Sequence, residues 1–279
     1  MGLQKKILII GAKGMLGTDL VKIFEADNNY QVIKADVSNI DITKKDQVDN
    51  FITLIKPNYV INAAAYTDVD KCEEEKEICN QVNGYALEYV AKACKNNKSV
   101  LVHISTDYVF DGNKSEGYKE DDVIDPVNQY GKSKAIGEQM VIKNLDNYYI
   151  IRISWLFGKS GKNFVETMLG LVRDRSELKV VNDQHGKPTY TVDLAKGIKN
   201  LIESKADYGS YHLPNEGETT WYDFAKEIFN IADINMKVVP CTSAEFPRPA
   251  VRPKYSSLIN TKLPKMRSWQ EALKEYLDK

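Results

Sequence analysis

Near its start, the sequence has an apolar run that leads directly into a glycine-rich loop and then into an amphipathic stretch. The run KKILII, residues 5–10, predicts a short buried strand, and MLGTDLVKIFEAD, residues 15–27, predicts a helix. Gly11, Gly14 and Gly17 follow the spacing G-x-x-G-x-x-G. Glycines in this place allow a tight turn, a close approach of a pyrophosphate and close packing of the helix on the strand. We therefore expect the chain to begin with the strand, loop and helix of a dinucleotide-binding sheet.

The alternation of apolar runs and helical patterns continues through the first half of the chain. Four more strands are predicted, at residues 30–36, 58–65, 99–105 and 148–155. Helices are predicted between them, at residues 43–57, 74–97 and from residue 129. The first of these helices is expected to open at Thr43 with a capping box that includes Asp46. Near-continuous apolar strands separated by helices indicate an α/β fold with a Rossmann-type doubly wound parallel sheet of about seven strands.

The second half of the chain has shorter and less regular patterns. Helices are predicted at residues 163–175, 191–204, 220–232 and 269–279, and prolines cluster between the last two. A strand, a loop and a helix over residues 180–198 would return the chain to the sheet. We therefore expect two units. The NAD(P)-binding Rossmann domain would comprise residues 1–157 plus about 182–204, and the smaller substrate-binding lobe about 158–181 plus 205–279.

The composition indicates an ordinary globular protein with no nucleic-acid or membrane partner. Charged residues make up 28% of the chain and leave a formal net charge of −1, so no basic surface is predicted. No apolar run approaches the length of a membrane span, and the first residues lack the apolar segment of a signal peptide. Four cysteines without a C-x-x-C spacing favour reduced thiols in a cytoplasmic protein, and three scattered histidines indicate no metal site.

A carboxylate follows the glycine loop at the distance typical of dinucleotide-binding sheets. Asp36 ends the second predicted strand, about 20 residues beyond the loop, where it can bind both ribose hydroxyls of NAD. Because the same carboxylate repels a 2′-phosphate, we expect NADH as the cofactor, and Lys13 and Lys34 leave NADPH open. The competing interpretation is a glycine turn in an α/β protein that binds no dinucleotide.

A tyrosine and a lysine four residues apart lie in the helix predicted from residue 129. Tyr130 and Lys134 therefore share one face of that helix. The segment STDYVFDG, residues 105–112, ends the preceding strand and faces the crevice in which such sheets bind ligands. A tyrosine is a poor acid or base at neutral pH, and we expect Lys134 and the oxidised nicotinamide to lower its pKa. The spacing alone is common in a chain with 16 tyrosines, but its place after the glycine loop favours a catalytic pair.

With these motifs, the chain resembles the extended short-chain dehydrogenase/reductases and, within them, the family of dTDP-4-dehydrorhamnose reductases. The glycine loop and the Y-x-x-x-K pair occur throughout the superfamily. The narrower resemblance rests on NAAAYTDVDKCE (62–73), STDYVFDG, RISWLFG (152–158), DQHGKPT (183–189) and RPKYSSL (252–258). It implies an NAD(P)H-dependent oxidoreductase of dTDP-rhamnose and polysaccharide biosynthesis. Such an enzyme reduces the C4 keto group of a dTDP-linked 4-keto-6-deoxy sugar, a nucleotide-sugar substrate.

The resemblance also implies a role for each matching position. Tyr130 would give its proton to the sugar C4 oxygen, Thr106 would bind the same oxygen, and Lys134 would hold the nicotinamide ribose. The other substrate contacts would be Asp107 and Trp155 on the sugar and Arg252 on the diphosphate. The cofactor contacts would be Gly11, Lys13, Gly14, Met15, Leu16 and Gly17 around the pyrophosphate, Asp36, Asp41 and Ile42 around the adenosine, and Ala63, Ala64 and Ala65 along the third strand.

Two other kinds of function share much of this pattern. A nucleotide-sugar dehydratase places an Asp-Glu pair after the threonine, whereas here Tyr108 follows Asp107, and an epimerase stays open. A non-catalytic NAD(P)-binding subunit, like the regulatory subunit of methionine adenosyltransferase, would have no need for Thr106, Tyr130 and Lys134. Some members of the family are described as dimers bridged by magnesium through acidic residues. No positions here match those residues, so no metal is predicted and a homodimer stays open.

Overall fold

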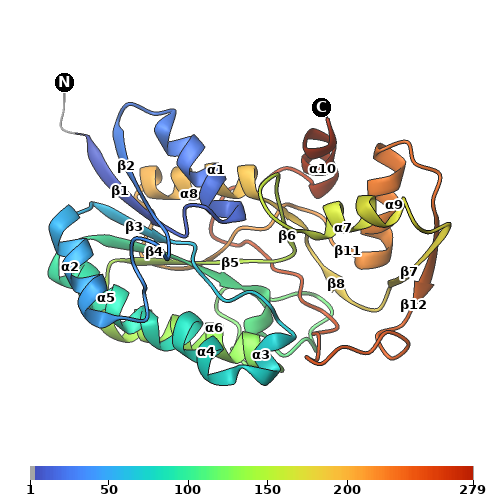
Figure 1. Ribbon diagram of the computed structural model, residues 1–279, viewed down its shortest axis with the longest axis horizontal. Coiled ribbons are helices and arrows are strands. Elements are labelled where there is room, and N and C mark those ends of the chain that lie inside the picture. The colour runs from blue at the N-terminus through green and yellow to red at the C-terminus, as the bar shows by residue number, and fades with distance from the viewer. Residues whose placement is uncertain (1–3, 279) are drawn as a thin grey trace.

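The computed structural model describes residues 4–278, and its centre is a six-stranded parallel sheet (Figure 1). The strands follow the order β2-β1-β3-β4-β5-β10, and all neighbours are parallel. Their bounds are β1 (Lys5–Ile10), β2 (Tyr30–Ala35), β3 (Tyr59–Asn62), β4 (Val100–Thr106), β5 (Tyr148–Ile153) and β10 (Gly209–His212). The order reverses direction between β1 and β3, and doubly wound sheets bind ligands outside the carboxyl ends of the strands at such a point.

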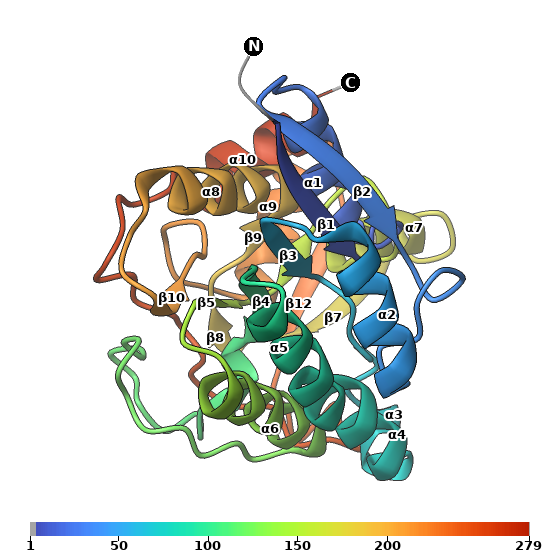
Figure 2. The same ribbon diagram turned by 90° about the vertical axis from the view of Figure 1, so that its left-hand side faces the viewer.

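Helices cover both faces of the sheet, as Figures 1 and 2 show. One face carries α1 (Met15–Glu25) and α8 (Thr191–Ser204), and the other carries α2 (Lys45–Ile55), α5 (Ala86–Asn96) and α6 (Gln129–Asn144). Side chains of β1 alternate between the two faces: Ile7 and Ile9 enter one buried apolar cluster, and Leu8 and Ile10 enter the other. Because both faces are apolar, the strand needs cover on each side. The predicted Rossmann-type α/β fold is confirmed.

A second group of elements lies to the right of the sheet in Figure 1. It contains three two-stranded pairs, β6 (Leu156–Phe157) with β9 (Thr189–Tyr190), β7 (Glu177–Val181) with β12 (Lys237–Cys241), and β8 (His185–Gly186) with β11 (Thr219–Thr220). Its helices are α7 (Phe164–Leu171), α9 (Trp221–Ile231) and α10 (Trp269–Leu277). Phe157, Phe224 and Trp269 belong to its own buried apolar cluster.

The main sheet has six strands rather than about seven, because β7 pairs with β12 outside it. The strand β10 lies in the main sheet, although the lobe is expected to contain residues 205–279. The boundaries between domain and lobe otherwise stay a prediction. None of the helices within residues 4–278 combines the length and apolar character that spanning a membrane requires.

The capping box predicted for the helix after β2 is wrong. Helix α2 begins at Lys45, and its N-cap residue, Lys44, forms no side-chain cap. The Thr43 hydroxyl donates instead to Asp41 Oδ1, at 2.6 Å, and the Thr43 N–H donates to the same oxygen at 2.9 Å. A carboxylate two residues upstream offers a local turn that competes with the helix cap.

The long helix predicted over residues 74–97 has three parts. It consists of α4 (Lys76–Asn80), a π-helical turn η1 (Gln81–Tyr85) and α5, and a short helix α3 (Lys71–Glu74) precedes it. The π turn packs closely on α6, since a Cβ atom on Gly84 would lie 2.9 Å from the Ile136 side chain. Insertions of this kind are frequent at functional sites.

Candidate active site

A pocket of about 880 Å³ opens at the carboxyl ends of β1, β3 and β4. Most of the predicted site residues line it: Gly11, Gly14, Met15, Leu16, Asp36, Asp41, Ile42, Ala63, Ala64, Ala65, Thr106, Asp107, Tyr130, Lys134 and Trp155. The other three, Lys13, Gly17 and Arg252, lie outside this lining. The fold thus brings predicted site residues that are up to 144 positions apart, from Gly11 to Trp155, to one cavity.

The glycine loop brings the backbone of β1 close to its neighbours. Gly11 has φ +82°, and a Cβ atom there would lie 2.8 Å from Ala64 N, so no other residue fits without a shift. A Cβ atom on Gly17 would lie 2.0 Å from Gly11 O, which explains why Gly17 packs against the loop and does not line the pocket. Helix α1 starts after Gly14 without a side-chain cap, so its first N–H groups remain available to an anion.

Asp36 lies at the end of β2 and is fixed by the backbone. Its Oδ2 accepts a hydrogen bond from Lys13 N–H at 3.0 Å, and its Oδ1 accepts one from Val37 N–H at 2.9 Å. Each carboxylate oxygen retains a further lone pair toward the pocket. The Lys34 ammonium pairs with Glu25 at 2.7 Å, so this lysine is engaged on the side of α1.

Tyr130 is the second residue of α6, and the start of this helix is tightly fixed. The Asn128 side chain caps the helix by accepting from Gly131 N–H at 2.8 Å. A Cβ atom on Gly131 would lie 2.0 Å from Tyr108 O, so the glycine lets the helix approach the segment after β4. The Tyr130 ring meets the Tyr108 ring edge to face, with centroids 5.9 Å apart.

The environment of Tyr130 keeps its hydroxyl protonated. Burial raises its pKa to about 12, the carboxylate of Asp107 adds to the rise, and a hydrogen bond with Thr106 opposes it. The lowered pKa expected for Tyr130 is therefore wrong for the protein alone, because burial and the Asp107 carboxylate raise it. A neutral O–H is the form that donates a proton.

Lys134 is buried one helical turn after Tyr130. Its Nζ donates to Ile104 O at 2.6 Å, which ties α6 to the end of β4. Burial lowers the pKa of its ammonium to about 8, although the nearby Glu138 carboxylate raises it. An ammonium in this position carries donors for hydroxyl oxygens in the pocket.

Thr106 and Asp107 form a polar pair at the end of β4. The Thr106 hydroxyl donates to Asp107 Oδ1 at 3.0 Å and accepts from Tyr108 N–H at 3.2 Å. Burial raises the pKa of Asp107 to about 7, although the nearby hydroxyls of Ser256 and Thr106 lower it. Its Oδ2 is buried and has no hydrogen-bond partner among the described residues. This oxygen is a candidate acceptor for a substrate hydroxyl.

Two tryptophans, Trp155 and Trp221, also line the pocket. Trp155 has φ +47°, a backbone conformation that is strained for a bulky residue and typical of functional sites. Its ring stacks on Trp221 with centroids 3.6 Å apart, and Gly186 leaves room for it. Trp221, from α9, lines the pocket but is absent from the sequence prediction, because nothing in its local pattern distinguishes it from an ordinary helix residue.

Arg252, predicted to meet the substrate diphosphate, is paired with an acid. Its guanidinium donates to Asp70 Oδ1 at 2.7 Å, and Arg248 contacts Asp70 Oδ2 at 2.9 Å. Burial alone would raise the pKa of Asp70, but the hydrogen bond from Arg252 brings it below the usual value. A role for Arg252 on a diphosphate stays a prediction.

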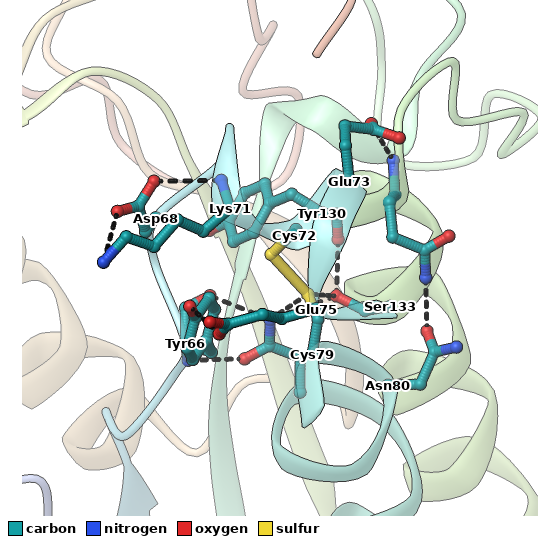
Figure 3. The surroundings of a disulfide bond; sticks show 12 residues. Tyr66, Asp68, Lys71, Cys72, Glu73, Glu75, Cys79, Asn80, Tyr130 and Ser133 are labelled. Atoms are coloured by element: carbon teal, nitrogen blue, oxygen red, sulfur yellow. Dashed lines mark hydrogen bonds and ion pairs between the residues drawn. A yellow bond between two sulfur atoms is a disulfide. The ribbon is translucent and has the colours of Figure 1, made fainter. Parts of the chain in front are cut away.

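The expectation of four reduced cysteines is wrong for one pair. Cys72 in α3 and Cys79 in α4 form a disulfide, with Cα atoms 5.6 Å apart (Figure 3). Cys94 and Cys241 are buried thiols. The helical backbone is interrupted at Glu75, between α3 and α4, and this interruption brings the two cysteines together. A spacing of seven residues does not reveal such an interruption.

The disulfide is in contact with the start of α6. Cys79 Sγ is 3.1 Å from Ser133 Oγ, which in turn donates to Tyr130 O at 2.7 Å (Figure 3). Gln129 N–H also donates to Glu73 Oε1 at 2.9 Å. The segment from α3 to η1 therefore supports the turn that carries Tyr130.

Comparisons with known proteins agree over almost the whole chain. A family model described as the RmlD substrate binding domain matches residues 5–279. A dTDP-4-dehydrorhamnose reductase from Aggregatibacter actinomycetemcomitans is 43% identical, and the match covers 96% of this chain and 97% of that protein.

Solved structures agree with these matches. That of a dTDP-4-dehydrorhamnose reductase from Clostridium acetobutylicum ATCC 824 has a TM-score of 0.95 at 47% identity and covers 98% of both chains. That of a dTDP-4-dehydrorhamnose reductase from Bacillus anthracis str. Ames, in complex with NADP, also has a TM-score of 0.95 at 40% identity. It covers 98% of this chain and 99% of the other.

Proposed function

Since the chain belongs to the family of the RmlD substrate binding domain, we propose that it reduces dTDP-4-dehydrorhamnose to dTDP-rhamnose with NADH, using Tyr130 as the proton donor. It is an NAD(P)H-dependent oxidoreductase of nucleotide-sugar biosynthesis. We propose the preference for NADH and the roles of the individual residues.

The residues of the pocket fit a dinucleotide. The Gly11 backbone leaves a space beside Ala64 that a Cβ atom would fill, and the uncapped start of α1 offers N–H groups to a pyrophosphate. Asp36 is fixed by two backbone N–H groups, so its remaining lone pairs can accept from both ribose hydroxyls. When bound, the reduced nicotinamide supplies a hydride to the carbonyl carbon of the sugar.

The single observation that carries the proposal is that Tyr130 lines one pocket together with the hydrogen-bonded pair Thr106 and Asp107. Tyr130 is partly buried, its raised pKa keeps the hydroxyl protonated, and the Thr106 hydroxyl is close enough to oppose part of this rise. A carbonyl oxygen between these two hydroxyls would accept a hydrogen bond from each, and its growing negative charge would take the proton of Tyr130. Lys134 supplies positive charge one turn away and compensates the phenolate that remains.

The preference for NADH rests on the charge of Asp36. A 2′-phosphate beside this carboxylate would place like charges in contact, whereas two hydroxyls would donate to it. Lys13 lies on the same loop and can offset part of the repulsion, so we expect NADPH to serve less well rather than not at all. The relative from Bacillus anthracis was solved with NADP.

The substrate is expected to lie between β4 and the two tryptophans. Trp155 and Trp221 present a rigid apolar wall, and the free Oδ2 of Asp107 offers an acceptor for a sugar hydroxyl. We infer that residues 158–181 and the part of 205–279 outside β10 supply the rest of the nucleotide-sugar site. Asp107 is followed by Tyr108, so the second acid that a dehydratase needs is missing from this position.

The test is the loss of NADH absorbance with a set of dTDP-linked 4-keto sugars, matched to the product by mass. The proposal predicts one product for each cofactor oxidised. An epimerase would convert the sugar without net consumption of NADH, and a non-catalytic subunit would bind the cofactor without turnover. Either result contradicts the proposed reaction.

A further inference from the structure

We propose that His103 is a positioning residue for the reaction: it accepts a hydrogen bond from the Lys134 ammonium and, together with Asn62, keeps that ammonium in place and charged. This inference rests on the proposed function, in which Lys134 serves the cofactor and Tyr130. His103 is buried and does not line the pocket.

The three residues form a line behind the pocket. Asn62 ends β3 and pairs in register with His103 in the neighbouring β4. Lys134 Nζ lies 3.4 Å from His103 Nε2, and Asn62 Nδ2 lies 3.2 Å from His103 Nδ1. Asn62 and His103 have no exposed surface, and Lys134 is 2% exposed, so water cannot take the place of these contacts.

The hydrogen-bonding groups of the three side chains determine which one donates to which. A lysine ammonium only donates, so His103 Nε2 must accept, and a neutral imidazole then carries its hydrogen on Nδ1. That N–H needs an acceptor. Asn62 Oδ1 is buried and has no hydrogen-bond partner among the described residues, and turning the amide by half a rotation brings it onto Nδ1–H. Lys134 then donates to His103, and His103 donates to Asn62.

Lys134 needs acceptors because it is buried. Its Nζ already donates to Ile104 O at 2.6 Å, and His103 provides a second acceptor, which leaves the third N–H for the pocket. Burial lowers the pKa of Lys134 to about 8, so the loss of one acceptor would move its neutralisation into the range near neutral pH. Burial, together with Lys134, holds the pKa of His103 well below the usual range, so His103 stays neutral.

Few other charged groups surround this line. Glu138 lies one turn further along α6 and raises the pKa of Lys134, but it is held by Arg152 of β5 in a buried ion pair at 2.7 Å. Tyr130 and Asp107 lie on the pocket side. The π turn contributes the neutral Asn83, whose O would be 2.2 Å from a Cβ atom on Gly137.

A second buried histidine provides a matched control. His212 in β10 also has no exposed surface, and its Nδ1 lies 3.1 Å from Ile259 O. Its Nε2 lies 3.4 Å from Arg152, not from Lys134. Replacement of either histidine removes a buried imidazole from the sheet, but only His103 touches the lysine of the site.

The experiment follows the titration of Lys134 directly, with the ¹³Cε signal of labelled lysine in the protein without substrate. Its variants are His103→Leu, His103→Gln, which retains an acceptor near the place of Nε2, and His212→Leu. A hydrogen bond to a charged group corresponds to roughly 1–2 pH units. We expect His103→Leu to lower the midpoint by about that much, and His103→Gln and His212→Leu to leave it nearly unchanged.

Turnover with saturating cofactor and sugar gives the second measurement. The alkaline fall of kcat in His103→Leu should move to lower pH together with the titration. If His103→Leu does not fold, Asn62→Leu should shift both in the same direction by a smaller amount. An unchanged Lys134 midpoint in the folded variants overturns the inference. Failure of the wild type to oxidise NADH with any sugar overturns the proposed function instead, and the titration is independent of that result.

Discussion

The cofactor side and the substrate side of the pocket are built in different ways. The cofactor side consists of strand ends and the loops that follow them directly, with Gly11 and Asp36 fixed by backbone contacts. The substrate side is assembled from distant segments, and its wall is a stack of Trp155 on Trp221, 66 residues apart. One side depends on local chain geometry, and the other depends on tertiary packing.

This difference decides which properties should respond to mutation. A change on the cofactor side should alter nicotinamide binding and leave sugar binding intact, and a change on the substrate side should do the reverse. Tyr130, Thr106 and Lys134 lie where the two sides meet, so changes there should affect the chemical step itself.

The largest effect is expected from Tyr130→Phe. Loss of the proton donor should lower kcat by roughly 10²–10⁴, because this is the range of general acid catalysis. The dissociation constant of NADH should change little, since the ring stays in place beside Tyr108. Steady-state kinetics and cofactor fluorescence measure the two effects. Tyr108→Phe, which keeps the ring contact, is the control, and turnover of Tyr130→Phe near the wild-type level would remove Tyr130 as the donor.

Asp36→Ala should weaken NADH binding by at least about tenfold, the value of one hydrogen bond to a charged group. The difference between NADH and NADPH should narrow, because the carboxylate that repels a 2′-phosphate is gone. Binding of both cofactors is measured by titration, with Asp46→Ala on the exposed surface of α2 as a control for lost charge. Unchanged NADH binding would place the ribose elsewhere.

Trp221→Ala should raise the KM for the sugar by roughly 2–10-fold, the range expected for one aromatic stack. Cofactor affinity should stay the same, since Trp221 belongs to the substrate side. Trp221→Phe retains a ring against Trp155 and should recover most of the loss. A larger change in NADH binding than in KM would break the separation of the two sides.

The smallest effect is expected on the stability of Asp107→Asn. Burial raises the folded-state pKa of Asp107 to about 7, so the folded protein binds this proton more tightly than the unfolded chain, whose carboxyl titrates near about 4. The stability that this tighter proton binding gives to the folded protein is fully present below about pH 4 and is lost as the pH rises toward about 7. The variant should therefore gain a few degrees in Tm relative to the wild type at pH 8 and little at pH 4. Thermal unfolding at both pH values checks the sign.

The sequence motifs predict most residues that line the cofactor side of the pocket but miss Trp221 on the substrate side, for a physical reason. The glycine spacing and the acid after β2 act through contacts within a few residues of each strand end, and these appear in the sequence as motifs. Trp221 reaches the pocket only because α9 packs on the Trp155 segment, a contact that no local pattern records. The Asp70 partner of Arg252 and the Cys72–Cys79 bond likewise depend on how α3 and α4 turn.

The proposed reaction is tested most directly by following the hydride from the cofactor to the sugar. The enzyme is incubated with dTDP-4-dehydrorhamnose and a reduced cofactor that carries deuterium at the transferable position, and the product is examined by NMR and mass spectrometry. Direct hydride transfer to the sugar predicts a product with deuterium on the sugar C4 carbon and one oxidised cofactor for each product, with Tyr130→Phe slowing but not redirecting the transfer. A product without deuterium at C4, or conversion of the sugar without oxidation of the cofactor, would contradict it.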